Sequence, residues 1–291
     1  MSRPLFVSYG EYRVGAILGD GAVHDVCGSL HGEVLHDADH ARTCLPAAIR
    51  DWAAIASGVE REPGIAVAEA GLLAPIPRPV NVFGAPVNYL AHQGELGADR
   101  SPAKGTVREL GLFVKAAGSV SGPRDAIELP IMPGREFHYE GEIAVVIGEG
   151  GEDLDDAGAE AAIAGFTGAL DVTLRLETEH REERSMRKSY RTFTPTGPAV
   201  LPYRRELLDT LGLELLVNGD RRQHGTLADL VLGVIGLVRL ASSIVRLEPG
   251  DLILTGTPEG VGRIVDGDRV ELRVDGLPAL QLDVADRRSA S

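Results

Sequence analysis

Two glutamates stand at the start of an apolar run that has the composition of a buried β-strand. Glu140 and Glu142 precede Ile143–Ile147, which is rich in β-branched residues and is followed by Gly148. Side chains alternate between the two faces of a strand, so both carboxylates should project from one face, with Cα atoms about 6.5 to 7 Å apart. Such a pair on a half-buried strand is unfavourable unless a positive charge lies between them. The segment therefore predicts a strand that begins either with a metal site or with a solvated face.

Oxygen-only ligation suits Mg²⁺, and also Mn²⁺ or Ca²⁺. Asp171 is a candidate third ligand, because it closes an apolar stretch in which an unpaired carboxylate is costly to desolvate. A capping role for Asp171 at the end of a strand or helix is the alternative. From these residues alone, both interpretations stay open.

The composition limits the class of protein. The chain has 291 residues, enough for one large domain or for one large and one small domain, and 44% of them are hydrophobic. Its formal net charge of −14 gives no electrostatic support to binding of nucleic acid or of an anionic membrane. We therefore expect a small-molecule partner. The N-terminus lacks a signal-peptide pattern, and Arg239 interrupts the apolar stretch 230–245, so we expect a cytoplasmic protein without a membrane span.

Short strand patterns dominate the chain, so the predicted fold class is α+β and mostly β. Residues 1–75 are expected to form a small β-rich domain, with strands over 5–9, 12–18 and 23–26 and a helix over 45–57. The proline-rich run 75–79 is a plausible linker. Residues 76–291 are expected to form the catalytic domain. It has strand-like runs at 112–115, 143–147, 213–217, 252–255 and 270–274, and helical patterns over 154–164 and 227–245.

Three histidines in the N-terminal part raise the question of a zinc site. They are His31, His36 and His40, but Cys27 and Cys44 do not have the spacing of paired zinc ligands. We expect scattered surface histidines and two reduced thiols without an assigned chemistry.

His92 and Glu95 form a candidate pair for activating water. On a helix, residues three apart share one face, so Glu95 would orient the imidazole of His92 and raise its basicity. A surface His and Glu on a short helix is the alternative interpretation.

Two later segments also carry candidate groups. Residues 175–191 mix basic and acidic side chains as a solvated helix does, but Lys188 precedes Thr192–Pro198, which is expected to be a fixed loop able to hold a cation beside a site. Thr255–Gly262 is expected to be a tight turn whose hydroxyls and exposed amides bind an oxyanion or a carboxylate.

Taken together, the motifs resemble the fumarylacetoacetate hydrolase family, in its acylpyruvase and 2-hydroxyhepta-2,4-diene-1,7-dioate isomerase-like branch. The resemblance covers residues 80 to 275. In chain order its motifs are Asn88-Tyr89-x-x-His92-x-x-Glu95, Phe113-x-Lys115, His138-Tyr139-Glu140-Gly141-Glu142, Asp171-Val172-Thr173-x-Arg175, Lys188 before Phe193-Thr194-Pro195-x-Gly197-Pro198, Asn218-Gly219, Gln223, Pro249-Gly250-Asp251 and Thr255-Gly256-Thr257-Pro258-x-Gly260-Val261-Gly262.

This resemblance implies a mixed β-roll catalytic fold, a homodimer, and hydrolysis or rearrangement of 1,3-dicarbonyl acids. It places the carboxylate ligands of Mg²⁺ or a related ion on Glu140, Glu142 and Asp171. The catalytic groups it implies are His92, Glu95 and Lys188, and we assign substrate contacts to Arg175, Thr257, Tyr139 and Lys115.

The predicted reaction is hydrolytic cleavage of a C–C bond in a small β-diketo or acylpyruvate-type acid. Isomerisation or decarboxylation of a 2-hydroxydienoate or 2-oxo acid at the same site is the alternative, and a catalytically silent metal- and ligand-binding protein is a third. The chain departs from the family pattern at Leu176, Thr178 and Arg191, and these positions bear on the substrate.

Overall fold

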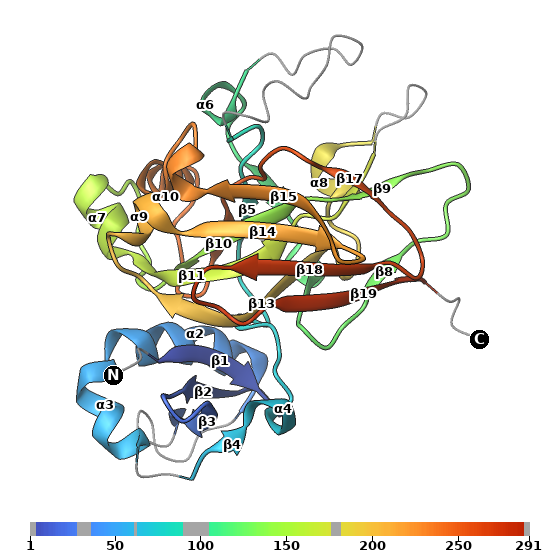
Figure 1. Cartoon of the computed structure of the whole chain (residues 1–291). Helices are drawn as coiled ribbons and strands as arrows, with labels where there is room; N and C mark the ends of the chain where they lie inside the picture. Colours follow the sequence, from blue (N-terminus) through green and yellow to red (C-terminus); the bar gives the residue numbers. More distant parts are fainter. Residues whose placement is uncertain (1–3, 28–35, 61–62, 90–104, 176–181, 288–291) are drawn as a thin grey trace.

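The computed structural model describes residues 4–27, 36–60, 63–89, 105–175 and 182–287 (Figure 1). Over these residues the chain forms three sheets. The large sheet has the strand order β4-β3-β2-β1-β13-β11-β10-β16-β5-β6, with β7 paired to β13, and the others have the orders β12-β9-β17 and β15-β14-β18-β19-β8. The mostly β, α+β fold predicted from the sequence is confirmed.

The N-terminal part alternates short strands with helices. Its elements are β1 (Leu5–Tyr9), β2 (Arg13–Ile17), β3 (Ala22–Asp25), α2 (Ala38–Arg50), α3 (Trp52–Val59), β4 (Ile65–Ala66) and α4 (Val67–Ala70).

The longer part begins with β5 (Val82–Gly84), and its helices are short. Up to the middle of the chain its elements are α6 (Val107–Leu110), β6 (Phe113–Lys115), the 3-10 helix η1 (Ala117–Ser119), β7 (Val120–Ser121), β8 (Ile127–Leu129), β9 (Phe137–Tyr139), β10 (Gly141–Ile147), α7 (Asp156–Ala161), β11 (Ile163–Leu170) and β12 (Thr173–Leu174). The remaining elements are α8 (Arg184–Arg187), β13 (Thr194–Pro202), α9 (Leu207–Thr210), β14 (Gly212–Val217), β15 (Asp220–Thr226), the 3-10 helix η2 (Leu227–Asp229), α10 (Val234–Ser242), β16 (Leu252–Leu254), β17 (Gly262–Ile264), β18 (Arg269–Val274) and β19 (Leu280–Asp286).

Strand β10 lies between two hydrophobic cores. Every residue of β10 is buried, so the strand is more enclosed than the half-buried strand expected from the sequence. Ile143, Val145 and Ile147 pack into the core shared with β14 and β18, which cross in front of β10 and β11 in Figure 1. Ala144 and Val146 face the second core. Because side chains alternate, Glu142 lies on the face of Ala144 and Val146.

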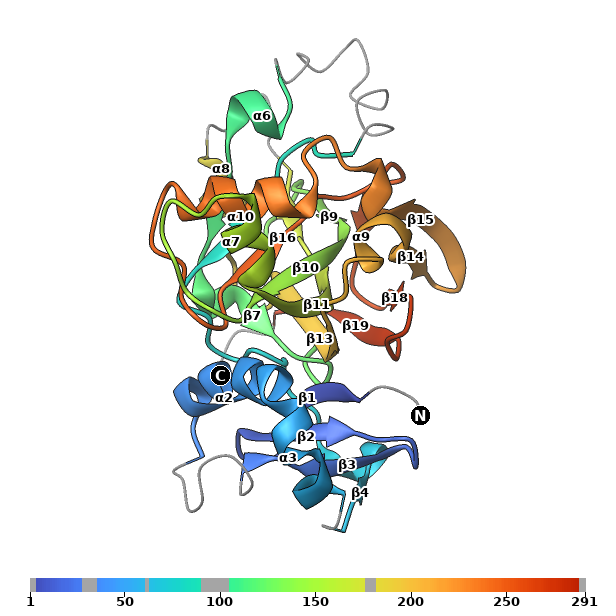
Figure 2. The same ribbon diagram turned by 90° about the vertical axis from the view of Figure 1, so that its left-hand side faces the viewer.

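The second core packs the N-terminal part against strands β10 and β16. It combines Phe6 of β1 and Leu45 of α2 with Val146 and with Leu254 of β16. Strand β1 pairs with β13 through Phe6 and Val200, and the Arg42 guanidinium of α2 donates a hydrogen bond to the Pro249 carbonyl, 2.7 Å away. In both ribbon views α2 lies on the side of the N-terminal strands that faces the rest of the molecule (Figures 1 and 2).

The predicted helices are present but shorter or divided. The N-terminal helix begins earlier than predicted, because the Asp37 carboxylate caps it by accepting a hydrogen bond from the His40 amide, and it divides at Asp51 into α2 and α3. The pattern over 154–164 contains only α7, since β11 starts at Ile163, and the pattern over 227–245 contains η2 and α10. Over the described residues, no helix has the length and apolarity needed to cross a bilayer.

The run Thr192–Pro198, predicted as a fixed loop, lies largely in strand β13, so that prediction is wrong. The ladder between β13 and β11 has a register shift between Phe166 and Gly168, next to the pair Gly168–Gly197. Prolines are tolerated where a ladder is irregular, because a hydrogen bond is already missing there.

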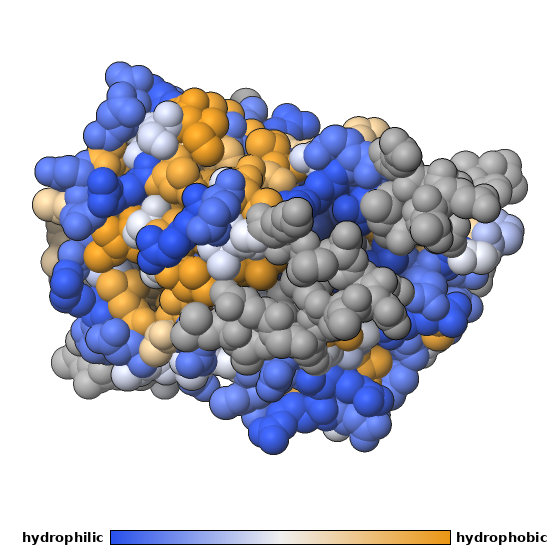
Figure 3. Space-filling model, turned by 90° about the horizontal axis from the view of Figure 1, so that it is seen from above, coloured by the Kyte–Doolittle hydropathy of each residue, from blue (hydrophilic) through white to orange (hydrophobic). Residues whose placement is uncertain are grey.

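Hydrophobic residues gather on the face that carries α6 and α10 (Figure 3). Leu110, at the end of α6, is 37% exposed, and Ile244, which follows α10, is 54% exposed.

Gly260 is a position where only glycine fits. Its φ is +93°, and a Cβ atom there would lie 1.9 Å from the carbonyl oxygen of Arg222. We expect Gly260→Ala to lower the free energy of unfolding by about 3 kcal/mol, because backbone strain and a backbone clash combine. Gly267→Ala is the matched control, with a φ of +88° and no atom within 4 Å of the added carbon. Urea denaturation should show a loss of about 1 kcal/mol for the control, and equal losses for the two variants would contradict the clash.

Candidate metal centre

Three buried carboxylates converge at the ends of two neighbouring strands. Glu142 lies in β10, Glu140 lies in the break between β9 and β10, and Asp171 directly follows β11. The Asp171 amide donates to the Glu140 carbonyl at 2.8 Å, which continues the β10–β11 ladder by one more residue. One oxygen from each carboxylate lies within 4.8 Å of the others, and the residues are 8%, 2% and 1% exposed for Glu140, Glu142 and Asp171. Glu140 was predicted to lie on the same strand as Glu142 but stands just before β10, and its carboxylate still converges with that of Glu142.

Two buried lysines contact these carboxylates. The Lys188 ammonium, at the end of α8, donates to Glu140 Oε2 at 2.8 Å, to Asp171 Oδ2 at 2.5 Å and to Thr173 Oγ1 at 2.7 Å. Lys115, on β6, donates to Asp171 Oδ1 and to the Phe193 carbonyl. All three N–H groups of Lys188 are thus engaged by protein oxygens.

Arg175 completes the basic side of the site. Its Nη2 donates to Glu140 Oε1 at 2.7 Å, and its side chain is 25% exposed. The sequence predicted a contact to a substrate carboxylate, and the structure shows this guanidinium holding Glu140.

The surroundings shift the pKa values of Glu140 and Glu142 in opposite directions. Burial raises the pKa of Glu140, but Lys188 and Arg175 outweigh it and hold that pKa well below its usual range. Burial, and then the nearby Asp171 and Glu140, raise the pKa of Glu142 well above its usual value. The Gly256 amide donates to Glu142 Oε2 at 2.6 Å. Among the described residues, no basic side chain makes an ion pair with Glu142, so one carboxylate lacks a cationic partner.

Burial and the neighbouring carboxylates also shift the pKa values of Lys115 and Lys188. Burial lowers the pKa of Lys115, and Asp171 offsets only part of that effect. For Lys188, burial also lowers the pKa, but Asp171 and Glu140 outweigh it and raise the pKa above its usual value.

A divalent cation fits this arrangement. Oxygen ligands about 2.1 Å from an octahedral ion lie about 3 to 4.2 Å from one another, and the three carboxylate oxygens all lie within 4.8 Å of one another. The ion would also serve as a cationic partner for the Glu142 carboxylate, which has none among the described residues. The donor set contains only oxygen, as hard cations prefer. The cluster can therefore hold a divalent metal.

Residues 255–257, which follow β16, form hydrogen bonds with the start of β10 at the border of this site. Thr255 Oγ1 donates to the Ile143 carbonyl and Thr257 Oγ1 donates to the Gly141 carbonyl. Thr255 is fully buried and Thr257 is 6% exposed. The prediction of exposed amides in this turn is wrong at Gly256, whose amide binds the Glu142 carboxylate, because the turn packs directly over the start of β10.

Gln223 and Thr173 support the site, and the sequence analysis gave neither a role. Gln223, on β15, accepts a hydrogen bond from the Gly141 amide and donates to Thr257 Oγ1 and to the Pro258 carbonyl. Thr173 accepts one from Lys188. Both residues belong to the motifs of the family resemblance, and Thr173 also has a spacing of two from Asp171.

Several predicted groups have protein partners or lie elsewhere. The Tyr139 hydroxyl donates to the Gly260 carbonyl at 2.9 Å. His92 and Glu95 lie outside the described residues. Asn88, just before them, donates from Nδ2 to the carbonyl of Thr255, the neighbour of Gly256, and accepts a hydrogen bond from the Leu232 amide. Asn88 is therefore anchored next to the acidic cluster.

The chain is similar to known proteins along most of its length. The family model described as fumarylacetoacetate (FAA) hydrolase, C-terminal, matches residues 81–285. The chain is 32% identical to the maleylpyruvate hydrolase of Aquipseudomonas alcaligenes over 289 residues, which covers 95% of this chain and 97% of that protein.

Two solved structures share the fold over nearly the whole chain. Maleylpyruvate hydrolase from Sphingobium sp. SYK-6, in complex with manganese(II) ion and pyruvate, has a TM-score of 0.79 at 30% identity, covering 98% of this chain and 100% of that one. A probable 2-hydroxyhepta-2,4-diene-1,7-dioate isomerase from Mycobacterium abscessus has a TM-score of 0.80 at 28% identity, covering 98% of this chain and 99% of that one. The prediction from the motifs is confirmed, and the chain is an enzyme of the fumarylacetoacetate hydrolase family.

Proposed function

We propose that this enzyme uses a divalent metal ion to hydrolyse a C–C bond in an acylpyruvate-type acid. The observation that carries the proposal is the buried set of Glu140, Glu142 and Asp171, in which Glu142 has no ion-pair partner among the described residues. Similarity to two maleylpyruvate hydrolases along almost the whole chain supports the substrate class.

The three carboxylates would hold Mg²⁺, with Mn²⁺ or Ca²⁺ as alternatives. Manganese(II) is the ion in the Sphingobium structure. When bound, the ion supplies Lewis-acid polarisation of the substrate carbonyls and a template that orients them. Lys115 donates a hydrogen bond that orients Asp171, and Arg175 helps to keep Glu140 ionised and oriented.

The reaction consumes one water for each C–C bond broken. His92, oriented by Glu95, takes a proton from water as the oxygen attacks the distal carbonyl. The bond between that carbon and the methylene carbon breaks, its electron pair stays on the methylene carbon, and that carbon then takes a proton. The products are a carboxylic acid and pyruvate.

Lys188 is placed to stabilise the enolate that leaves. Its three N–H groups now bind Glu140, Asp171 and Thr173, so it would exchange one of these contacts for the enolate oxygen. We propose that Arg175 anchors the substrate carboxylate with its remaining N–H groups, and that Tyr139 and Thr257 border the substrate.

Isomerisation is the second candidate, because the M. abscessus protein named as an isomerase shares the fold. The same enolate stabilisation would then act without attack by water, and decarboxylation of a 2-oxo acid would use it as well. Mass-resolved product analysis distinguishes these reactions. Pyruvate and a second acid in equal amounts support hydrolysis. An unchanged mass, or release of CO₂, supports the alternatives.

His92→Ala tests the role of the proposed base. With Mg²⁺ or Mn²⁺ present, we expect pyruvate formation to fall by about 10² to 10⁴-fold, the usual contribution of general base catalysis. Glu95→Gln should cause a smaller fall, because it removes only the group that orients the imidazole. Unchanged turnover in His92→Ala would refute this role.

We also propose a homodimer, as the family resemblance implies. The exposed apolar residues of the face in Figure 3 are available for such a contact. Sedimentation equilibrium should give twice the chain mass of 30.8 kDa, and a single-chain mass at micromolar concentration would contradict the proposal.

A further inference from the structure

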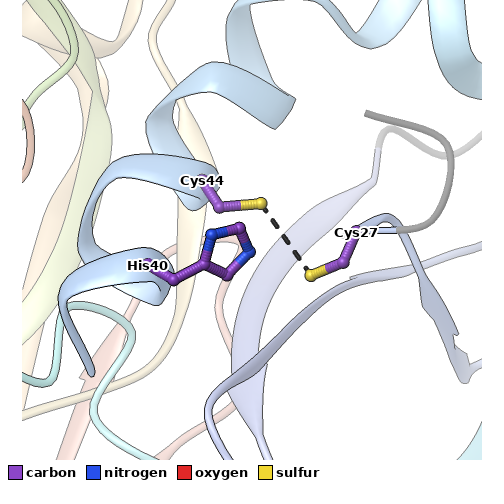
Figure 4. Close-up of side chains that lie close together, drawn as sticks. All are labelled: Cys27, His40 and Cys44. Atoms are coloured by element: carbon purple, nitrogen blue, oxygen red, sulfur yellow. Dashed lines mark hydrogen bonds between the residues drawn. The ribbon is translucent and has the colours of Figure 1, made fainter. Parts of the chain in front are cut away.

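A second group of metal-ligating side chains lies in the N-terminal part, away from the acidic cluster. Cys27 follows β3, and His40 and Cys44 lie on α2 (Figure 4). Their donor atoms all lie within 4.8 Å of one another, and the three side chains point toward one another. Both cysteines are 1% exposed and His40 is half-buried.

The distances match those of a metal site. The two sulfur atoms are 3.9 Å apart. Two thiolates bound tetrahedrally to zinc at about 2.3 Å lie about 3.8 Å apart, whereas a disulfide requires about 2.05 Å. His40 and Cys44 are four residues apart on one helix, so both project from the same face toward Cys27.

The surroundings of Cys27 favour the thiolate, which is the form that binds metals. The Val14 amide donates to Cys27 Sγ at 3.3 Å. A hydrogen bond from the Cys44 thiol, together with contacts to Val14 and His40, outweighs burial and lowers the pKa of Cys27 to about 6. Both sulfur atoms are enclosed in an apolar core.

We propose that Cys27, His40 and Cys44 bind a thiophilic divalent cation of the zinc type. His36 is a candidate for the fourth position, because its ring lies 5.9 Å from that of His40, centroid to centroid, and its buried Nδ1 has no hydrogen-bond partner among the described residues. The ligand set of sulfur and nitrogen differs from the oxygen-only set of the acidic cluster, so the two sites select different ions.

The site would have a structural role. It would tie the end of β3 to α2, and Leu45, next to Cys44, packs in the core that also contains Val146 of β10. A bound ion would thus fix the helix that packs on the face of β10 to which Glu142 also belongs. The prediction of scattered surface histidines is wrong for His40, because the fold brings it beside both cysteines; His31 lies outside the described residues.

Cobalt(II) provides a direct test, because thiolate ligands give it a near-ultraviolet charge-transfer absorption that carboxylate ligands do not. The full-length protein, freed of metal and kept reduced, is first saturated with Mg²⁺ to fill the acidic cluster and is then titrated with Co²⁺. We expect the absorption to saturate at one cobalt per chain. Zinc should then remove it by displacement and raise the unfolding temperature.

Three variants complete the test. Cys27→Ser should abolish the absorption. His40→Gln, which keeps both thiols and changes a half-buried side chain, should weaken cobalt binding at least tenfold. His224→Gln, an exposed histidine on β15, is the matched control and should behave as the wild type. The proposal is overturned if the wild type shows no such absorption, if His40→Gln binds cobalt like the wild type, or if thiol titration finds the two cysteines joined as a disulfide.

Discussion

Asp171→Asn is expected to abolish metal-dependent turnover. The amide keeps the size of the side chain but removes one of the three carboxylates of the cluster. Both Lys115 and Lys188 donate to this carboxylate, so two ammonium groups would then face a neutral side chain. We expect Mn²⁺ affinity to fall at least 100-fold and kcat/KM to fall by about 10³-fold or more, equivalent to several kcal/mol of transition-state stabilisation.

Calorimetric titration with Mn²⁺ and an assay of pyruvate release measure both quantities. Asp251→Asn is the matched control, since Asp251 is also a fully buried carboxylate but accepts its hydrogen bonds from Asn81 and the Glu248 amide. The control should lose stability and keep its Mn²⁺ affinity. Wild-type Mn²⁺ affinity in Asp171→Asn would remove Asp171 from the ligand set.

Lys188→Met should separate metal binding from catalysis. Methionine fills much of the space of the lysine stem but carries no charge and donates no hydrogen bond. The ammonium competes with a cation for Glu140 Oε2 and Asp171 Oδ2, so its removal should leave Mn²⁺ affinity unchanged or make it up to about tenfold tighter. Turnover should fall by about 10² to 10³-fold, because the leaving enolate loses its charged donor.

Calorimetry and the pyruvate assay on the same Lys188→Met preparation decide this prediction. A loss of Mn²⁺ affinity in proportion to the loss of turnover would mean that Lys188 only maintains the cluster. Thermal unfolding in saturating Mn²⁺ serves as the check that the variant is folded.

Local patterns predicted several strands, because the signal for a strand lies within a few residues. Ile143–Ile147 and Leu213–Val217 fall in β10 and β14 with nearly the predicted bounds. Ile163–Leu170 was missed as a strand, because its alanines and glycines resemble the end of the preceding helix. Strand β13 was also missed, because its prolines are typical of a loop.

The site could be predicted only where its residues are neighbours in sequence or part of a known motif. The spacing of Glu140 and Glu142 suggested their convergence, but Asp171 reaches them through the pairing of β10 with β11, which no local pattern encodes. The cluster of Cys27, His40 and Cys44 was not predicted, since it depends on how α2 packs beside β3. Long-range strand pairing and helix packing are decided by burial of the whole core rather than by any short segment.

The metal dependence of pyruvate formation from an acylpyruvate such as maleylpyruvate is the most decisive measurement. Enzyme freed of metal by a chelator should release no pyruvate, and added Mg²⁺ or Mn²⁺ should restore pyruvate and the second acid in equal amounts, saturating together with the binding of one ion to the acidic cluster. Full pyruvate release by the chelated enzyme, or restored turnover that gives only an isomer of unchanged mass, would contradict a metal-dependent C–C hydrolase.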